Sequence, residues 1–165
     1  MLKIELKGDQ VLLERIDARP EGMRRALTRE VTAIILELER HIKADKLSGQ
    51  VLHVRSGDLR RSVHSVLPVT QTPTGVVGQV AQSGDVKYGR IHEFGGKTPA
   101  HIIEAKKGEA LAFMWRGKQV FFKKVNHPGS TMPERSYMRS GLADMRSEIT
   151  LRLRAVVKDQ LDLRK

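Results

Sequence analysis

An apolar stripe with helical spacing constrains the fold more than any other feature of the chain. Between Pro20 and Ser48, apolar residues recur every three or four positions, which predicts one long helix with a continuous buried face. Pro20 suits the first position of a helix, and Gly49 is a natural stop. A helix of this length spans about 43 Å, more than a compact core requires, so we expect part of it to lie against another subunit. The stripe comprises Met23, Leu27, Val31, Ile34, Leu38 and Ile42, widened by Ile35 and Leu36.

A second amphipathic helix is predicted near the C-terminus. The segment 131–134 has the Thr and Glu spacing of a capping box, which favours a helix start there. Arg and Lys in the last turns complement the negative end of the helix dipole. The predicted buried stripe is Met138, Leu142, Met145, Ile149, Leu153 and Val156.

Segments of alternating polarity predict strands. Residues 1–7 alternate apolar and charged side chains and are followed by a short amphipathic piece over 11–16. Residues 63–69 and 76–81 are predicted strands joined by Thr72–Gly75, which has Pro second and Gly last, as a type I turn favours. Together these last segments predict a β-hairpin.

A second hairpin is predicted around Arg116 and Gly117, because Gly117 can adopt the positive φ of a tight turn. A two-residue loop pairs Trp115 with Lys118, Phe113 with Val120 and Leu111 with Phe122. All three pairs fall on one face, so we expect Phe113 and Phe122 to be buried.

The order of these elements predicts an α+β fold. We expect an antiparallel sheet built from the two hairpins and packed by the long N-terminal helix and the C-terminal helix. A chain of 165 residues with 39% hydrophobic residues suits a single domain over residues 1–165 with a basic C-terminal tail. The core is mostly aliphatic, because aromatic residues make up only 4%.

The segment from Lys87 to Gly96 concentrates aromatics, a His-Glu pair and glycines in ten positions. Tyr88, Ile91 and Phe94 recur every third residue, so they share one face of a short helical turn. The two glycines after Phe94 would end that turn. We interpret the segment as a helical turn that is pinned to a sheet.

The sequence offers no constellation for catalysis, a cofactor or a metal ion. The absence of cysteine excludes disulfides, a thiolate nucleophile and Cys-based zinc sites. His92-Glu93 lacks the second His four residues on that a helical zinc motif needs. Walker loops, dinucleotide-binding glycine patterns and nucleophile elbows are also missing. No apolar run approaches the roughly 20 residues that span a bilayer, so no membrane partner is expected.

The formal net charge of +11 is unevenly distributed: +1 over residues 1–50, +3 over 51–100 and +7 over 101–165. Such a balance favours a polyanionic partner, although a merely soluble basic surface explains it equally well. Two basic pairs, Lys106-Lys107 and Lys123-Lys124, flank the hairpin with Trp115 at its tip. They are candidate DNA-facing residues; the alternative is charge that keeps a surface soluble beside core aromatics.

Five segments resemble, in order and spacing, the phage tail-completion and head–tail joining proteins. Residues 56–62 (Ser-Gly-Asp-Leu-Arg-Arg-Ser) are similar to their T/S-G-x-L-R-x-S element, and residues 88–95 to their Y-A-x-x-x-E-F-G segment. Residues 105–115, 125–129 and 133–138 resemble the run K…ALxF…V-x-H-P-G…P-A-R-P-F-L. Glu134 and Ser136-Tyr137 depart from that pattern.

This resemblance implies a structural protein of a tailed phage or prophage, assembled in the host bacterial cytoplasm and located in the neck or tail of the virion. It would form a ring, commonly a hexamer, between the tail terminator and the head connector, with genomic DNA in the lumen. The rival hypothesis is a stand-alone protein that binds nucleic acid without sequence preference. Candidate interface or fold-pinning residues are Arg60, Arg61, Tyr88, His92, Glu93, Phe94 and Trp115.

Overall fold

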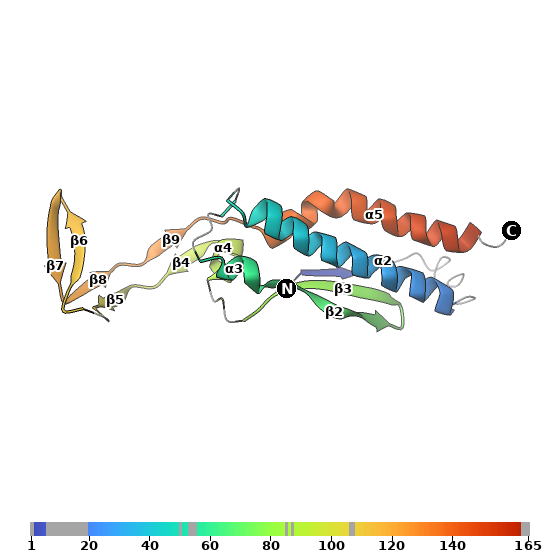
Figure 1. Cartoon of the computed structure of the whole chain (residues 1–165), viewed down its shortest axis with the longest axis horizontal. Helices are drawn as coiled ribbons and strands as arrows, with labels where there is room; N and C mark the ends of the chain where they lie inside the picture. Colours follow the sequence, from blue (N-terminus) through green and yellow to red (C-terminus); the bar gives the residue numbers. More distant parts are fainter. Residues whose placement is uncertain are drawn as a thin grey trace.

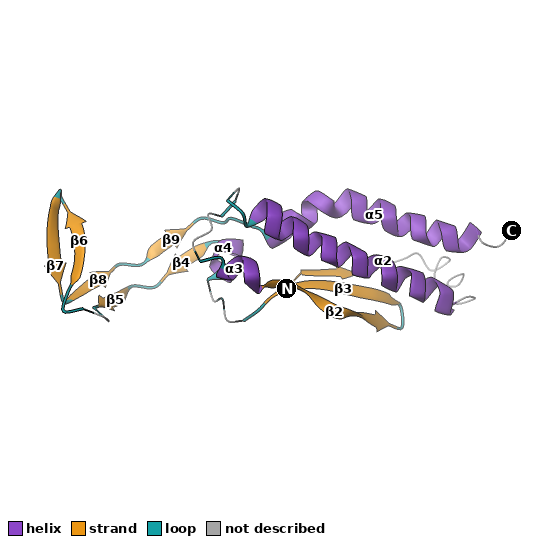
Figure 2. Cartoon of the chain, in the orientation of Figure 1, coloured by secondary structure: helices purple, strands orange, loops and turns teal. Residues whose placement is uncertain are grey.

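The structure, a computed structural model, describes residues 2–5, 20–49, 51–52, 56–84, 86, 88–105 and 108–162. It has two visibly different parts (Figure 1). The first, which we call the body, holds the helices and a three-stranded sheet. The second, the arm, comprises residues 96–132 and projects from one end of the body as paired strands (Figure 2).

The chain has an α+β fold with a long N-terminal helix and a C-terminal helix, as predicted. The elements of the body are β1 (Leu2–Glu5), α2 (Pro20–His41), the π-helical turn η1 (Ile42–Lys46), α3 (Asp58–Ser62), β2 (Val63–Thr72), β3 (Gly75–Gln82), α4 (Gly89–Phe94) and α5 (Met138–Asp162). The elements of the arm are β4 (Gly96–Thr98), β5 (His101–Glu104), β6 (Leu111–Trp115), β7 (Lys118–Phe122), β8 (Lys124–His127) and β9 (Ser130–Met132). The predicted amphipathic piece over 11–16 lies outside the described residues.

The body sheet is antiparallel with strand order β1–β3–β2. The first predicted hairpin is present as β2 and β3, and the predicted N-terminal strand pairs with β3. Helix α2 crosses the central strand at Gly78, where an added Cβ would lie 2.6 Å from side-chain carbons of Val31 and Ile35. A glycine is therefore what lets α2 approach the sheet so closely.

Hydrogen bonds also hold β2 against α2. The backbone N–H of Ser65 donates to the Glu39 carboxylate at 2.7 Å, and its hydroxyl donates to the Ile35 carbonyl at 2.9 Å. Ile35 itself is fully buried. The sheet and the helix are thus joined by both apolar packing and specific polar contacts.

The predicted stripe of the long helix is buried, but two details of the prediction are wrong. Leu36 is 46% exposed, because it points away from the sheet side of α2. The α-helix ends at His41 rather than near Ser48, and the chain continues as η1. At this point α5 comes close, since an added Cβ on Gly141 would lie 2.7 Å from Ile42 Cγ1.

Helix α5 lies along α2 (Figure 1) and buries Met138, Ile149 and Leu153 of its predicted stripe. Arg152 crosses between the helices and forms ion pairs with Glu30, at 2.6 Å, and with Glu37. The predicted capping box at 131–134 is wrong, because β9 continues to Met132 and the helix begins only at Met138.

The arm is a chain of three two-stranded antiparallel ladders: β4–β9, β5–β8 and the hairpin β6–β7. The predicted register of this second hairpin is confirmed, with Trp115 opposite Lys118 and Leu111 opposite Phe122. The expectation that both hairpins share one sheet is wrong. The chain leaves the body at Gly95, in positive φ, and β4 pairs with the returning β9 instead of with the body sheet.

The aromatic face of the second hairpin is not buried as expected. Phe122 is 48% exposed, and Phe113 is half-buried. Their rings stack on each other with centroids 5.8 Å apart. Within the part of the chain that the structure describes, a two-stranded ladder without a covering layer cannot bury its side chains more fully.

Among the described residues, none of the helices combines the length and the apolar character needed to cross a lipid bilayer.

Candidate functional site

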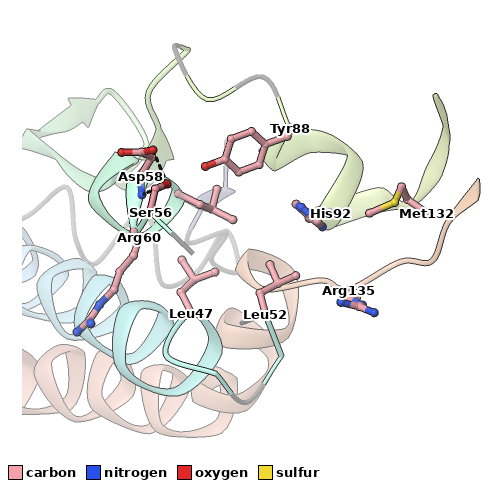
Figure 3. A pocket seen from close by; sticks show the side chains of 11 residues that line it. Leu47, Leu52, Ser56, Asp58, Arg60, Tyr88, His92, Met132 and Arg135 are labelled. Atoms are coloured by element: carbon pink, nitrogen blue, oxygen red, sulfur yellow. Dashed lines mark hydrogen bonds between the residues drawn. The ribbon is translucent and has the colours of Figure 1, made fainter. Parts of the chain in front are cut away.

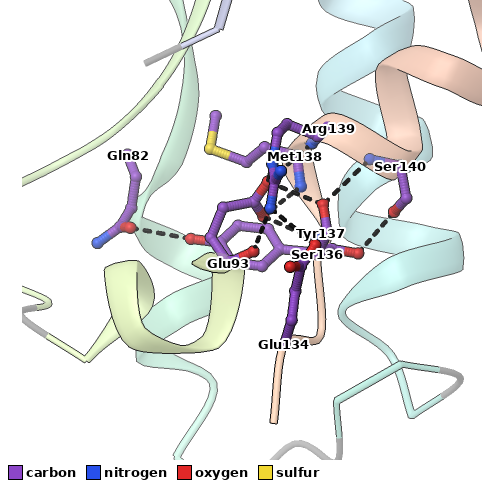
Figure 4. A network of polar contacts seen from close by, with 8 residues as sticks. All are labelled: Gln82, Glu93, Glu134, Ser136, Tyr137, Met138, Arg139 and Ser140. Carbon is purple, nitrogen blue, oxygen red and sulfur yellow. Dashed lines mark hydrogen bonds and ion pairs between the residues drawn. The ribbon is translucent and has the colours of Figure 1, made fainter. Parts of the chain in front are cut away.

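The carboxylate of Glu93 anchors the start of helix α5 (Figure 4). Glu93 lies on α4 and is only 4% exposed. It accepts hydrogen bonds from the backbone N–H groups of Tyr137, Met138 and Arg139 at 2.8, 2.9 and 3.0 Å. The first N–H groups of a helix have no partners within the helix, and they favour a negative charge. Glu93 therefore caps α5 from a segment more than forty residues earlier in the chain.

Side chains complete the set of donors around Glu93. The Ser136 hydroxyl and Nε of Arg139 donate to the same carboxylate oxygen at 2.9 and 3.0 Å. Arg139 also binds the Glu93 carbonyl and the Glu134 carboxylate. Burial alone would raise the pKa of Glu93, but these hydrogen bonds outweigh burial and lower the pKa below its usual value. Glu93 is thus held in its ionised form.

Tyr137 ties this anchor to the body sheet. It is 1% exposed, and its hydroxyl donates to Oε1 of Gln82 at 2.9 Å. Burial, assisted by the negative charge of Glu93, raises the pKa of Tyr137, so the phenol stays protonated. Gln82 in turn donates to the Val86 carbonyl at 2.7 Å and touches α4, where an added Cβ on Gly89 would clash with it. One network therefore joins α4, β3 and α5.

A hollow of about 530 Å³ lies beside this anchor, between α3, α4 and the chain that follows η1 (Figure 3). It brings the segment 56–60 next to Tyr88 and His92, which the sequence places almost thirty residues away. Its described walls are mainly apolar and also include the charged residues Asp58, Arg60 and Arg135. The lining residues are Leu47, Leu52, Ser56, Gly57, Asp58, Leu59, Arg60, Tyr88, His92, Met132 and Arg135.

His92 contributes a buried nitrogen to this site. Its Nδ1 has no hydrogen-bond partner among the described residues, and its ring packs edge-on against Tyr88 with centroids 5.9 Å apart. Burial, and secondarily the charge of Arg135, lowers the pKa of His92, so the ring is neutral near pH 7. Within the described ranges no three His, Asp or Glu side chains converge to hold a metal ion.

The side chains of Arg60 and Arg61, both candidate interface or fold-pinning residues, lie in different environments. Arg60 lines the hollow, whereas Arg61 turns back to its own helix and pairs with Asp58 at 2.5 Å. The N-cap position of α3 is occupied by Gly57, in positive φ. Ser56, one residue earlier, donates its hydroxyl to the Asp58 carboxylate and accepts the Asp58 backbone N–H at 3.4 Å.

The predicted helical turn at residues 88–94 exists as α4, and Gly95 ends it. Its apolar face is not the buried one, however: Tyr88 is 45% and Phe94 58% exposed. Phe94 is covered on one side by the Arg139 guanidinium, 4.6 Å from the ring centre. The buried side chain of α4 is Glu93, because the capping interaction with α5 outweighs the preference of the aromatics for burial.

The remaining candidates lie on the arm and are not brought to the hollow. Trp115 is 60% exposed at the end of β6. Lys123 and Lys124 are exposed, and Lys124 lies 3.8 Å from the Glu104 carboxylate across the ladder. Lys106 and Lys107 lie outside the described residues.

Sequence reasoning missed the partners of Glu93, namely Ser136, Tyr137 and Arg139. Placing the helix start at the apparent capping box hid them, because a helix starting there would have included these residues. A signal was present: a hydroxyl residue and an aromatic stand directly before the apolar stripe that begins at Met138.

Comparisons with known proteins identify no relative: no protein-family model, no curated protein and no solved structure matches this chain.

Proposed function

We propose that this chain is a structural virion protein of a tailed phage or prophage that forms a ring, with six copies, at the head-proximal end of the tail. In this proposal it completes the tail and joins it to the head, in contact with the tail terminator and the head connector. Genomic DNA passes through the lumen, and the subunit itself performs no reaction. The ring is assembled in the bacterial cytoplasm and stays in the virion neck or tail.

The observation that carries the proposal is the arm with its uncovered apolar side chains. Met114, Trp115, Phe121 and Phe122 are each between 48% and 67% exposed on one short hairpin. Exposed apolar surface gathered in one place is typical of a protein–protein interface. A subunit whose body buries a core of apolar side chains, and whose arm leaves apolar side chains exposed, suits a building block of an assembly.

The arrangement of the segments that resemble tail-completion proteins supports the same proposal. Residues 56–60, Tyr88 with His92, and Arg135 all line the hollow at the base of the arm. Glu93, from the second of these segments, caps the helix that follows the last of them. The resemblance thus concerns residues that fix the junction of body and arm, which sets the direction in which the arm leaves the subunit.

Deleting the gene from the phage or prophage that encodes this chain tests the proposal. We expect filled heads and finished tails to accumulate separately, and a plasmid copy of the gene to restore joined particles. Electron microscopy of the lysates distinguishes the two states. Joined, infectious particles made without the protein would refute the proposal.

The alternative function, binding of nucleic acid without sequence preference, is favoured by the basic residues of the arm. Lys97, Lys118, Lys123 and Lys124 are exposed there. A protein of this kind binds short duplexes tightly at low salt, with an affinity that falls steeply as salt rises. Fluorescence anisotropy with a labelled duplex over a salt series measures this; a tail-completion ring requires no such affinity in the free subunit.

A further inference from the structure

We propose that the hairpin β6–β7 of each subunit pairs edge to edge with the same hairpin of neighbouring copies, so that the arm tips form one continuous β-structure around the ring. This inference rests on the proposed ring and names the surface that closes it. Its partner is a second copy of this chain. The following observations concern residues 111–122, all of which the structure describes.

Both edges of the hairpin are open. Among the described residues, the sheet that contains β6 and β7 has only these two strands, so each strand has one side without a ladder partner there. Natural edge strands are usually protected by charged side chains, proline or bulges. β6 reads Leu-Ala-Phe-Met-Trp and β7 reads Lys-Gln-Val-Phe-Phe, so Lys118 is the single charge on both strands. Such an edge is a template for another strand.

Both faces of the hairpin are apolar as well. One face carries Trp115 and Phe122, and the other carries Met114 and Phe121. With about 150–250 Å² per aromatic side chain, the exposed fractions correspond to on the order of 450 Å² of apolar surface. Edge-to-edge neighbours cover the flanks of these side chains rather than the whole of both faces. This area is therefore an upper limit on the apolar surface that the pairing buries, against the roughly 800 Å² that one partner contributes to a standard interface. An isolated two-stranded hairpin is marginal in water, so a neighbour on each side is what would stabilise it.

Charge identifies the partner as apolar. A polyanion or an acidic protein would be met by several cations on the contact faces, but the faces of β6 and β7 offer only Lys118. The same hairpin of another copy, with a single charge on its two strands, is a β-surface that complements these apolar faces. Because β6 and β7 run antiparallel, the β7 edge of one copy can accept the β6 edge of the next and continue the alternation. Repetition by rotation then closes a ring without free edges.

Trp115 provides a direct readout, because it is the only tryptophan in the chain. In dilute full-length protein its emission should be that of an exposed indole, since the side chain is 60% exposed. We expect a shift to shorter wavelength as protein concentration rises, in parallel with the increase in mass measured by sedimentation. A shift that occurs only with phosphatidylglycerol vesicles would mean that the tip binds lipid, and would overturn the inference.

Cysteine cross-linking tests the pairing itself, because the chain contains no cysteine. Met114→Cys on β6 and Gln119→Cys on β7 are made in separate chains and mixed, or co-expressed so that they enter the same particles. Both side chains lie on the same face of the hairpin. Mixing Ala112→Cys with Gln119→Cys, or Met114→Cys with Phe121→Cys, extends the test to registers shifted by two residues in either direction. The matched control is Arg154→Cys, exposed on α5.

We expect disulfide-linked dimers and higher multimers from the hairpin pairs, at a yield about tenfold above the Arg154→Cys control, because assembly raises the effective concentration of the thiols. Rings or joined particles that form without hairpin cross-links would overturn the inference and leave the proposed function intact. Hairpin cross-links in a protein that proves dispensable for joining heads to tails would support the pairing and refute the proposed function.

A pair of double variants distinguishes edge pairing from non-specific hydrophobic association. Met114→Lys with Phe121→Lys places two charges on the contact face and should abolish association, whereas Met114→Leu with Phe121→Leu should preserve it. Thermal unfolding of the body, measured by circular dichroism, should be the same in both variants because β6 and β7 lie at the end of the arm away from the body (Figure 1). Association that survives in the lysine variant would contradict the inference.

Discussion

Body and arm are built from similarly apolar segments but bury them very differently. In the body, α2 covers a three-stranded sheet and α5 packs along α2, and side chains such as Ile35 and Val63 are fully buried. In the arm, each ladder has two strands, and Trp115 and Phe121 remain more than half exposed. Among the described residues, the body has a covering layer over its apolar face, whereas the arm has none.

The difference teaches that apolar alternation alone does not decide what a hairpin packs against. β2–β3 and β6–β7 are both hairpins with alternating side chains, yet only β2–β3 lies under a helix. The Glu93 anchor separates the two parts, because it fixes α4 to α5 just where β4 begins. We therefore expect mutations in the body to change the free energy of unfolding, and mutations at the arm tip to change association.

The largest effect on stability is expected at Glu93. Glu93→Ala removes the acceptor for three backbone N–H groups and leaves Arg139 without its buried partner. We expect the free energy of unfolding to fall by about 3–5 kcal/mol, because several buried N–H donors lose their acceptor, at roughly 1–3 kcal/mol for each unsatisfied group. Urea unfolding followed at 222 nm measures the change. Glu134→Gln is the matched control, since Glu134 is 55% exposed and should cost at most about 0.5 kcal/mol; equal losses in the two variants would contradict the capping role.

A pair of truncations tests the contrast between body and arm directly. Ile35→Ala removes a fully buried side chain and should lower the free energy of unfolding by about 2–5 kcal/mol. Phe121→Ala removes a larger side chain that is 64% exposed, and should change it by no more than about 0.5 kcal/mol in dilute protein. The comparison fails if Phe121→Ala destabilises the dilute subunit as much as Ile35→Ala does.

A smaller loss is expected where α2 crosses the sheet. Gly78→Ala would place a methyl group 2.6 Å from carbons of Val31 and Ile35, so the helix must move outward. We expect a cost of about 1–3 kcal/mol in the same urea experiment. Gly84→Ala serves as control, because no described atom lies within 4 Å of the added carbon. A stabilised Gly78→Ala variant would show that the close approach is not a constraint.

The pH dependence of stability sharpens the account of Glu93. Its pKa is lower in the folded protein than in the unfolded chain, where it is about 4.3. The unfolded chain therefore binds more protons in this range, and the stabilisation is complete above about pH 4.3 and is lost as the pH falls through the folded pKa. The stability advantage of wild type over Glu93→Gln should shrink progressively in acid. Urea midpoints over a pH series measure it, and an advantage that is independent of pH would contradict the assignment.

Local patterns in the sequence predicted the helices and hairpins well. The stripe of α2, the register Trp115 opposite Lys118 and the helical turn at α4 follow from spacing within a few residues. Long-range relations did not follow. The hairpin β6–β7 stands apart from the body sheet because β4 pairs with β9. These are two short strands, separated by more than thirty residues, and neither has a strong sequence pattern of its own.

The candidate site was predicted only in part, for a similar reason. Glu93 was selected from its segment, but its role depends on backbone N–H groups of α5, which carry no signature in the side-chain sequence. The hollow likewise depends on how α3 and α4 meet. Sequence reasoning identified which residues stand out, whereas tertiary contacts determine what those residues bind.

Hydrogen exchange followed by mass spectrometry, on the dilute subunit and on the assembled ring, tests the central claim most directly. We predict that amides of α2 and β3 are protected in both states, whereas amides of β6 and β7 exchange rapidly in the dilute subunit and at least about tenfold more slowly in the ring. Amides of β6 and β7 that are already as protected as α2 in the dilute subunit, or that exchange equally fast in both states, would contradict the claim that the arm is completed by another copy.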